Sequence, residues 1–292
     1  MLNQQTLTEE IKTLDSLRGL VETYKIVAAT TMRRIRNSVL QNRFFHIGLG
    51  GLYRDVQRAY QKELYKTVQN KKPDLIHMSL TLKKHNGKTA LVLLSANTGL
   101  YGGIIYKTFN LFLQEAKKHP DYDLVLVGKV GELFFKKNDS RRAYVYFDFS
   151  DLGISASALR SITSQLSLYE RVIVFYGAFK NILIQRPSFF EISSSGKDLP
   201  IAEVMESPAY LFEPSLQEVA DFFETEIFAS LLEQSFHESR LGKTASRFVS
   251  LDRSSTNIES AFKNVRLERR KLGHRLFNQK QLNSLSGIAL WG

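Results

Sequence analysis

The chain of 292 residues contains no cysteine, which excludes disulfide bonds, thiolate metal sites and cysteine nucleophiles. Its six histidines are scattered and show neither an HExxH motif nor a paired spacing suited to zinc. No apolar run reaches the roughly eighteen residues of a membrane span, and residues 1–10 (MLNQQTLTEE) lack the basic and apolar parts of a secretory signal. We therefore expect no metal site, no membrane insertion and a cytoplasmic protein.

Proline is absent from both ends of the sequence, since all six prolines lie between residues 73 and 214. Because proline breaks helix interiors, each proline-free end can form a helix far longer than the usual ~11–12 residues. We predict a long N-terminal helix over residues 1–70, an α/β globular part over 71–213 and a long C-terminal helix over 214–292. Glycines at positions 48, 50 and 51 predict a bend or break in the first helix.

Both terminal segments carry apolar residues at the seven-residue interval of a coiled coil. In the first segment the repeat consists of Leu7, Leu14, Val21, Ala28 and Ile35, with Leu17 and Tyr24 three residues further on. In the last segment it consists of Ile258, Val265 and Leu272, joined by Phe262, Arg269 and Leu276. These spacings predict a two-helix seam with one charged position, although ordinary amphipathic helices of a bundle would show similar periodicity.

The middle of the chain alternates short apolar runs with helical stretches, which predicts an α/β sheet. The expected strands are 89–94, 124–127, 143–147 and 171–176, with one or two more within 182–192. The expected helices are 104–118 and 155–169, and residues 193–214 are the expected connection into the final helix. The fold class is therefore α/β, with a Rossmann-like globular domain between the two long helices.

Catalytic motifs are not apparent in the sequence. Two Gly-Lys-Thr triplets, at residues 87–89 and 242–244, lack the glycine that a phosphate-binding loop needs five residues earlier. The segment Gly99-Leu100-Tyr101-Gly102-Gly103 lacks GxGxxG spacing, so a tight strand-to-helix turn is favoured over a nucleotide site. No GxSxG elbow and no close carboxylate pair occurs. We expect no catalytic residue and no cofactor.

The formal net charge of +11 favours a polyanionic or acidic partner, but it does not choose among nucleic acid, anionic lipid and acidic protein. The densest basic run lies near the end of the last helix and consists of Arg266, Arg269, Arg270, Lys271, His274 and Arg275. A second group on the first helix consists of Arg33, Arg34, Arg36 and Arg43. Each run is also compatible with a solvated helix face. Residues 276–292 carry a single charge, Lys280, and form a nearly neutral, partly apolar tip suited to turning inside an apolar sleeve.

Several segments resemble the gamma subunits of F-type ATP synthases, and the resemblance covers most of the chain. Residues 25–34 (KIVAATTMRR) resemble the family's KMVAAAKLRRA, and residues 96–103 (ANTGLYGG) resemble SDRGLCGG but lose its Asp, Arg and Cys. Residues 127–136 (VGKVGELFFK) are similar to IGKKGxDFFRK, and Tyr176-Gly177-Ala178-Phe179 with Gln185-Arg186-Pro187 is similar to YNxF…QxP. Further matches are Leu231-Leu232-Glu233 to ALLES, residues 246–257 to ARMxAM…ATxN, and residues 286–289 to SGAxA.

This resemblance implies a non-catalytic rotor shaft, in which an antiparallel coiled coil of the two termini stands inside a ring of alternating alpha and beta subunits. The α/β foot would contact the membrane c ring and the epsilon subunit, on the cytoplasmic face of the membrane. In the family, an Arg, a Gln and a Thr near the end of the last helix meet a beta-subunit catch loop. His274 and Asn278 stand at the last two positions, and the Arg falls near Gly273. These departures indicate a divergent branch or a specialised paralogue.

The resemblance thus gives a set of expected rotor-to-beta contacts and an expected apolar tip. The contacts are Lys25, Arg33, Arg34, Arg266, Arg269, Arg270, His274, Arg275 and Asn278. The tip residues are Leu282, Leu285, Ile288 and Leu290. The main alternative is a basic coiled-coil protein that binds nucleic acid, which would bind duplex DNA with a steep salt dependence. A second alternative is a nucleotide-using α/β enzyme.

Overall fold

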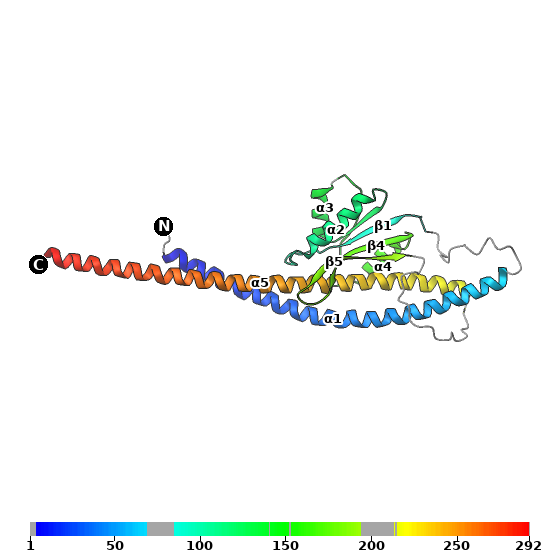
Figure 1. Cartoon of the computed structure of the whole chain (residues 1–292), viewed down its shortest axis with the longest axis horizontal. Helices are drawn as coiled ribbons and strands as arrows, with labels where there is room; N and C mark the ends of the chain where they lie inside the picture. The colour runs from blue at the N-terminus through cyan, green and yellow to red at the C-terminus, as the bar shows by residue number, and fades with distance from the viewer. Residues whose placement is uncertain are drawn as a thin grey trace. The chain divides into compact units, whose positions relative to one another are not determined.

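The computed structural model describes residues 4–139, 141–151, 153–193, 213 and 215–291, except for residues 69–84. Its elements follow the predicted order of long helix, α/β domain and long helix (Figure 1). They are α1 (Gln4–Val68), β1 (Thr89–Leu94), α2 (Ile104–Lys118), β2 (Asp123–Val127), α3 (Lys129–Asn138), β3 (Val145–Phe147), α4 (Ala156–Leu166), β4 (Arg171–Phe179), β5 (Gln185–Ser193) and α5 (Leu216–Trp291). The predicted fold class is confirmed.

The five strands form one mixed sheet in the order β3-β2-β1-β4-β5. The first four of these strands are parallel, and β5 pairs antiparallel with β4. Side chains alternate between the two faces of each strand, and in β1 and β2 both faces are buried. This two-sided burial explains why these strands appear in the sequence as unbroken apolar runs.

Helices cover both faces of the sheet. On one face, Val92, Val125 and Val174 pack with Ile162 of α4 and Leu232 of α5. On the other face, Leu91, Leu126 and Phe175 pack with Phe109 and Phe112 of α2 and with Phe135 of α3. The last helix therefore supplies part of the core of the α/β domain.

Helix α3 is the element that the sequence analysis did not predict. It begins directly after Gly128, whose φ of 95° is open to glycine but strained for other residues. A further glycine at position 131 lowers its intrinsic helix propensity. Its core-facing contribution comes mainly from Phe135, which is fully buried. Tertiary packing rather than local sequence therefore stabilises this helix.

The chain divides into two units, and each is described by itself. One consists of Met1–Thr30 with Arg247–Gly292, and the other is Thr31–Ser246. In the first unit the helices pair antiparallel, since Lys25 lies beside Asp252, Glu22 beside Ser255, and Arg18 beside Phe262. In the second unit, Ile35 and Val39 of α1 pack against Leu241 of α5.

Of the two sets of seam positions predicted on α1, the structure has the seven-residue repeat but not the intermediate residues. Leu7, Val21, Ala28 and Ile35 are buried at the predicted seven-residue interval. Leu17 and Tyr24, predicted three residues further on, are 45% and 43% exposed, so that part of the prediction is wrong. Met32 and Val39, which lie four residues after Ala28 and Ile35, take the second position instead. The contact face of α1 therefore combines residues four positions apart. On a helix surface such residues are neighbours, as are residues three positions apart.

On α5, Val265 is buried and Ile258, Phe262 and Leu272 are partly buried, as predicted. Arg269 and Leu276 are exposed, so neither is a seam position in the structure. A guanidinium at position 269 retains its hydration in this way, which avoids the cost of burying a charge. The predicted charged seam position is therefore wrong.

Helix α1 runs without interruption through Gly48 and Gly51, so the predicted break is absent. A Cβ added at either glycine would meet nothing within 4 Å, so the absence of a side chain there is not required by packing. Each glycine in a helix interior costs about 0.5–1 kcal/mol relative to alanine, which a long helix tolerates. The predicted connection over residues 193–214 falls largely outside the described residues, as do the predicted boundaries near residues 70 and 213.

Candidate functional site

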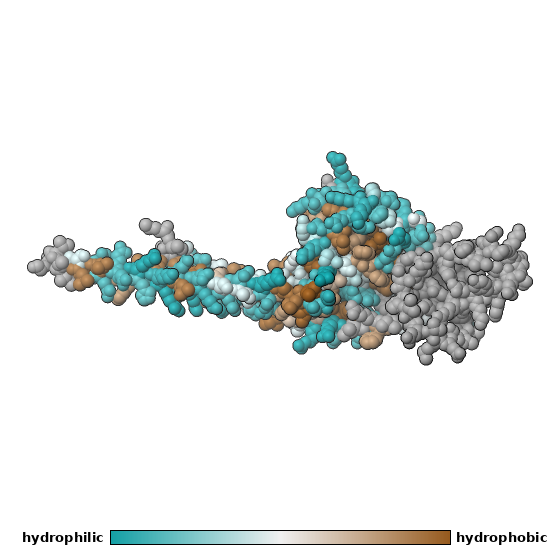
Figure 2. Space-filling model, in the orientation of Figure 1, coloured by the Kyte–Doolittle hydropathy of each residue, from teal (hydrophilic) through white to brown (hydrophobic). Residues whose placement is uncertain are grey.

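The predicted basic residues near the end of α5 are accessible to a partner. Arg266, Arg269, Arg270, His274, Arg275 and Asn278 are all exposed. Arg266 lies over the ring of Phe262, with its guanidinium carbon 4.5 Å from the ring centroid. Arg18 of α1 lies 5.5 Å from the same centroid, so this ring is held by cations from both helices. The structure thus presents a hydrated cationic surface on this segment, visible as hydrophilic atoms in Figure 2.

Lys25, predicted as a contact with beta, makes its contacts within the helix pair. Its Nζ lies 3.2 Å from Asp252 Oδ1 of α5 and 3.2 Å from Glu22 Oε1. The Ser255 hydroxyl donates to the same Glu22 oxygen over 2.7 Å. Hydrogen bonds from Ser255 and then from Lys25 hold the pKa of Glu22 below its usual value, and the bond to Glu22 raises the pKa of Lys25. These four residues form a polar clamp across the seam.

The remaining predicted residues are Arg33 and Arg34 on α1 and the apolar residues at the end of α5. Arg33 is exposed on α1, and Arg34, also exposed, lies near enough to Arg240 of α5 for its charge to act on that guanidinium. At the tip, Leu282 and Leu285 are each 63% exposed, and Figure 2 shows apolar patches on this part of the surface. The side chains of Ile288 and Leu290 lie outside the described residues. The predicted residues are divided between the two units, with Arg33 and Arg34 in Thr31–Ser246 and the others in the unit of the two chain ends.

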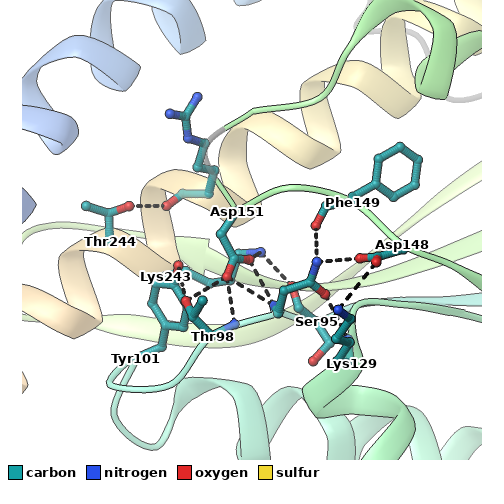
Figure 3. A network of polar contacts seen from close by, with 11 residues as sticks. Ser95, Thr98, Tyr101, Lys129, Asp148, Phe149, Asp151, Lys243 and Thr244 are labelled. Carbon is teal, nitrogen blue, oxygen red and sulfur yellow. Dashed lines mark hydrogen bonds and ion pairs between the residues drawn. The ribbon is translucent and has the colours of Figure 1, made fainter.

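The loop after β1 is held by polar contacts that the sequence did not reveal (Figure 3). The Asp151 carboxylate accepts hydrogen bonds from the backbone amides of Asn97 and Thr98, over 3.1 and 2.8 Å, and from the Thr98 hydroxyl over 2.7 Å. The Asn97 side chain donates to Asp148 and to the Phe149 carbonyl, and its oxygen accepts from the Lys129 amide. The loop is thus held by an acid from the segment after β3.

The last helix reaches the same region through Lys243, whose side chain is 12% exposed. Its Nζ donates to the Ser95 carbonyl over 2.6 Å at the end of β1 and lies 3.9 Å from Asp151 Oδ1. The preceding residue, Gly242, contacts β4 so closely that a Cβ there would stand 2.0 Å from the Gly177 carbonyl oxygen. The second Gly-Lys-Thr triplet therefore anchors a helix to the sheet.

Glycines also allow the segment after β2 to approach β1. A Cβ on Gly128 would stand 2.9 Å from the Ala96 nitrogen, and one on Gly131 would stand 2.7 Å from the Ser95 Cβ. The Gly99–Gly103 loop makes a tight turn into α2, with Leu100 at a φ of 67°. The first Gly-Lys-Thr triplet lies in another turn, where Gly87 has a φ of 70°. The Lys88 Nζ lies 3.5 Å from Asp123 Oδ2.

The part of the chain that the structure describes contains neither a metal-binding cluster nor a membrane-spanning helix. There, no group of three His, Asp or Glu side chains is arranged to hold a metal ion. In the same residues, no helix combines the length and the apolar character that crossing a membrane requires.

The fold defines a class of protein in which two terminal helices pair with each other and flank a mixed α/β sheet. The profile of the ATP synthase family matches residues 3–272. The ATP synthase gamma chain of Stenotrophomonas maltophilia (strain K279a) is 21% identical over 99% of each chain. That of Heliobacterium modesticaldum is 25% identical over 84% of this chain and 86% of its own.

Solved structures share the fold at low sequence identity. A central stalk and c-ring structure of the Tetrahymena thermophila mitochondrial ATP synthase matches with a TM-score of 0.54 and 18% identity, covering 81% of this chain and 99% of its own. A Euglena gracilis mitochondrial ATP synthase structure matches with a TM-score of 0.53 and 12% identity, covering 89% and 94%.

The chain belongs to the ATP synthase gamma chain family and is a divergent gamma subunit of an F-type ATP synthase, a non-catalytic rotor subunit of the central stalk. The resemblance read from its motifs is confirmed. The alternatives of a nucleic-acid-binding protein and of a nucleotide-using enzyme are therefore not adopted.

Proposed function

We propose that the paired helices turn inside a ring of alternating alpha and beta subunits, while the α/β domain contacts the membrane c ring and the epsilon subunit. The protein would then act on the cytoplasmic face of the membrane as a peripheral subunit. The division into helix 1–70, α/β foot 71–213 and helix 214–292 belongs to the same proposal. Two related structures support it, since one is of a central stalk with a c ring and the other of an F1 part with a c ring.

The proposed coupling needs no chemistry in the shaft. An asymmetric helix pair presents a different face to each beta subunit at each angle, and each face stabilises a different nucleotide affinity through differential contact energy. The exposed cations Arg266, Arg269, Arg270 and Arg275 carry this proposal, because they form a dense positive surface on a paired helix. Lys25, Arg33, Arg34, His274 and Asn278 are further proposed contacts with beta.

The end of α5 has a different proposed role. Leu282 and Leu285 are exposed apolar side chains in a segment with a single charge, Lys280. Together with Ile288 and Leu290, they would turn against an apolar sleeve of the ring. A surface with few charges makes few directional contacts there, so rotation meets little electrostatic resistance.

The test is ATP-driven rotation of a soluble complex of the alpha, beta and gamma subunits. Replacing Arg266, Arg269, Arg270 and Arg275 with alanine should lower the torque while the complex still assembles. A matched control replaces four exposed cations of the α/β domain, Lys117, Lys137, Arg160 and Lys180, and should leave the torque unchanged. Unchanged rotation of the first variant under viscous load contradicts the proposed contacts.

A further inference from the structure

The aromatic side chain of Phe262 on α5 contacts cations from both helices of the pair. The guanidinium carbon of Arg266, on the same helix, lies 4.5 Å from the centroid of the Phe262 ring. That of Arg18, on α1, lies 5.5 Å from the same centroid. Both distances are within the ~6 Å over which an aromatic face attracts a cation. One phenyl group is thus in contact with arginines of two different helices.

The spacing along α5 explains why Arg266 meets this phenyl group. Residues four positions apart are neighbours on a helix surface, and long side chains lean toward the helix N-terminus, so Arg266 lies back over Phe262. Phe262 is partly buried in the helix seam, whereas Arg266 is exposed. The seam therefore holds the phenyl group in place, while the guanidinium above it stays in contact with water.

Arg266 is the member of the basic run that has an aromatic residue four positions before it. The residues four positions before the other five members are Val265, Arg266, Leu267, Arg270 and Lys271. Two of these are aliphatic and three are cationic, so none presents the negative face of an aromatic ring to a guanidinium. A restraint of this kind is therefore particular to Arg266 within the basic run.

Charge repulsion along α5 would otherwise push the Arg266 side chain away from this position. Arg269 and Arg270 follow it by three and four residues, and like charges at these spacings repel each other. Cation–π attraction at an exposed site is at least as strong as the repulsion within one such pair. The phenyl group therefore offsets the repulsion and narrows the range of conformations open to Arg266.

Arg18, the second cation at Phe262, is balanced by a carboxylate of its own helix. Its Nη2 lies 2.9 Å from Asp15 Oδ1. Of the two arginines at the phenyl group, Arg266 is the one that forms no ion pair with the described residues. Arg18 thus contacts Phe262 from the side of α1, and Arg266 keeps its charge available to a partner.

We propose that Phe262 is a positioning residue, which holds the guanidinium of Arg266 in the orientation in which it meets an acidic side chain of a beta subunit. This inference rests on the proposed contact between Arg266 and beta. An arginine that moves freely loses side-chain entropy when it binds a carboxylate, and one that is already restrained loses less. A restrained guanidinium also directs its fork of donors one way, which suits a carboxylate that it meets at one angle of rotation.

The test is ATP-driven rotation of the complex of alpha, beta and gamma subunits with substitutions at Phe262. Phe262→Leu keeps an apolar residue in the seam and should lose at least about half of the torque lost in Arg266→Ala, because the aromatic face is gone. Phe262→Tyr keeps the aromatic face and should retain the torque. In the Arg266→Ala background, Phe262→Leu should cause no further loss, because Phe262 acts through that guanidinium.

Val265→Ala is the matched control, because it removes buried side-chain volume from the same seam and leaves both Phe262 and Arg266 in place. Urea unfolding of the full-length chain measures how far each variant weakens the helix pair. Equal torque losses in Val265→Ala and Phe262→Leu would show that seam packing sets the torque, and would overturn the inference. Full torque in Phe262→Leu, with a loss in Arg266→Ala, overturns it as well and leaves the contact with beta standing. Full torque in Arg266→Ala overturns that contact and the inference together.

Discussion

Gly242 of α5 and Gly177 of β4 are in direct backbone contact, and neither position has room for a side chain. A Cβ on Gly242 would stand 2.0 Å from the Gly177 carbonyl oxygen, and one on Gly177 would stand 2.7 Å from Ile104 Cγ1. The last helix is thereby pressed onto the sheet at a point next to the partly buried Lys243. This contact fixes the distance between α5 and the sheet, and the Lys243 bond to the Ser95 carbonyl fixes its rotation about the helix axis.

Gly242→Ala should therefore destabilise the α/β unit. The added methyl group overlaps backbone, which cannot move aside like the end of a flexible side chain, and such overpacking costs about 1–3 kcal/mol. Gly273→Ala on the same helix is the control, because a Cβ there meets nothing within 4 Å. That change should stabilise by ~0.5–1 kcal/mol through helix propensity. Urea unfolding of the full-length chain measures both, and equal midpoints for the two variants contradict the close contact.

The clamp across the helix seam gives a prediction for pH. The pKa of Glu22 is lowered in the folded state, chiefly by the Ser255 hydroxyl and then by Lys25. A depressed carboxyl pKa contributes stability above the unfolded-state pKa, and this contribution is lost as the pH falls through the folded-state pKa. The pairing of α1 and α5 should thus weaken on acidification below the usual range of a glutamate.

Ser255→Ala should raise the pKa of Glu22 toward its ordinary value, measured by carbon-detected NMR titration of the side-chain carboxyl. Ser254→Ala is the matched control, since the Ser254 hydroxyl donates to the Ser250 carbonyl of its own helix. If Glu22 titrates identically in both variants, the Ser255 bond does not set its pKa.

Lys25 can be tested as a clamp residue by a double-mutant cycle with Asp252. The two side chains are 25% and 59% exposed, so screening by water limits their coupling to about 0.2–1 kcal/mol, and salt should reduce it further. The cycle uses Lys25→Ala, Asp252→Ala and the double variant in urea unfolding. Strictly additive effects would show that the ion pair contributes nothing to the pairing.

Related variants separate the clamp from the proposed beta contact of Lys25. Lys25 has two clamp partners, Glu22 and Asp252, so both must be removed. If Lys25 acts only through the clamp, Lys25→Ala has no further effect on ATP-driven rotation once Glu22 and Asp252 are alanine. A loss of torque that persists in the Glu22→Ala, Asp252→Ala background supports a direct contact between Lys25 and the ring.

The sequence predicted those helices and strands whose pattern of apolar residues follows directly from their burial in the core. Strand β1 begins and ends where its apolar run does, and α2 spans the predicted 104–118, because the core contacts both. Helix α3 was missed because Gly131 opposes helix formation and the docking of Phe135 compensates for it. The i+4 seam was missed because Leu17 and Tyr24 satisfy the heptad spacing but remain on the surface.

The polar contacts of the α/β unit could not have been predicted in the same way. Asp151 lies 54 residues from Asn97 in sequence, and Lys243 lies 148 residues from Ser95, so no local spacing connects them. The exposure of the α5 cations could be predicted, because arginine and lysine side chains are rarely buried without a partner.

The antiparallel register has a mechanical consequence at the end of α5. A step of three residues back along α1, from Lys25 to Glu22, matches a step of three forward along α5, from Asp252 to Ser255. Continued at this rate, the register brings the first described residue of α1, Gln4, beside Gly273, and every side chain described from His274 to Ser286 is exposed. Within the described residues, the stretch of α5 from His274 to Ser286, about 20 Å long, is thus a helix whose side chains all face solvent. Because one helix twists more easily than a helix pair, we expect torque applied at Arg275 to be transmitted less stiffly than torque applied at Arg266.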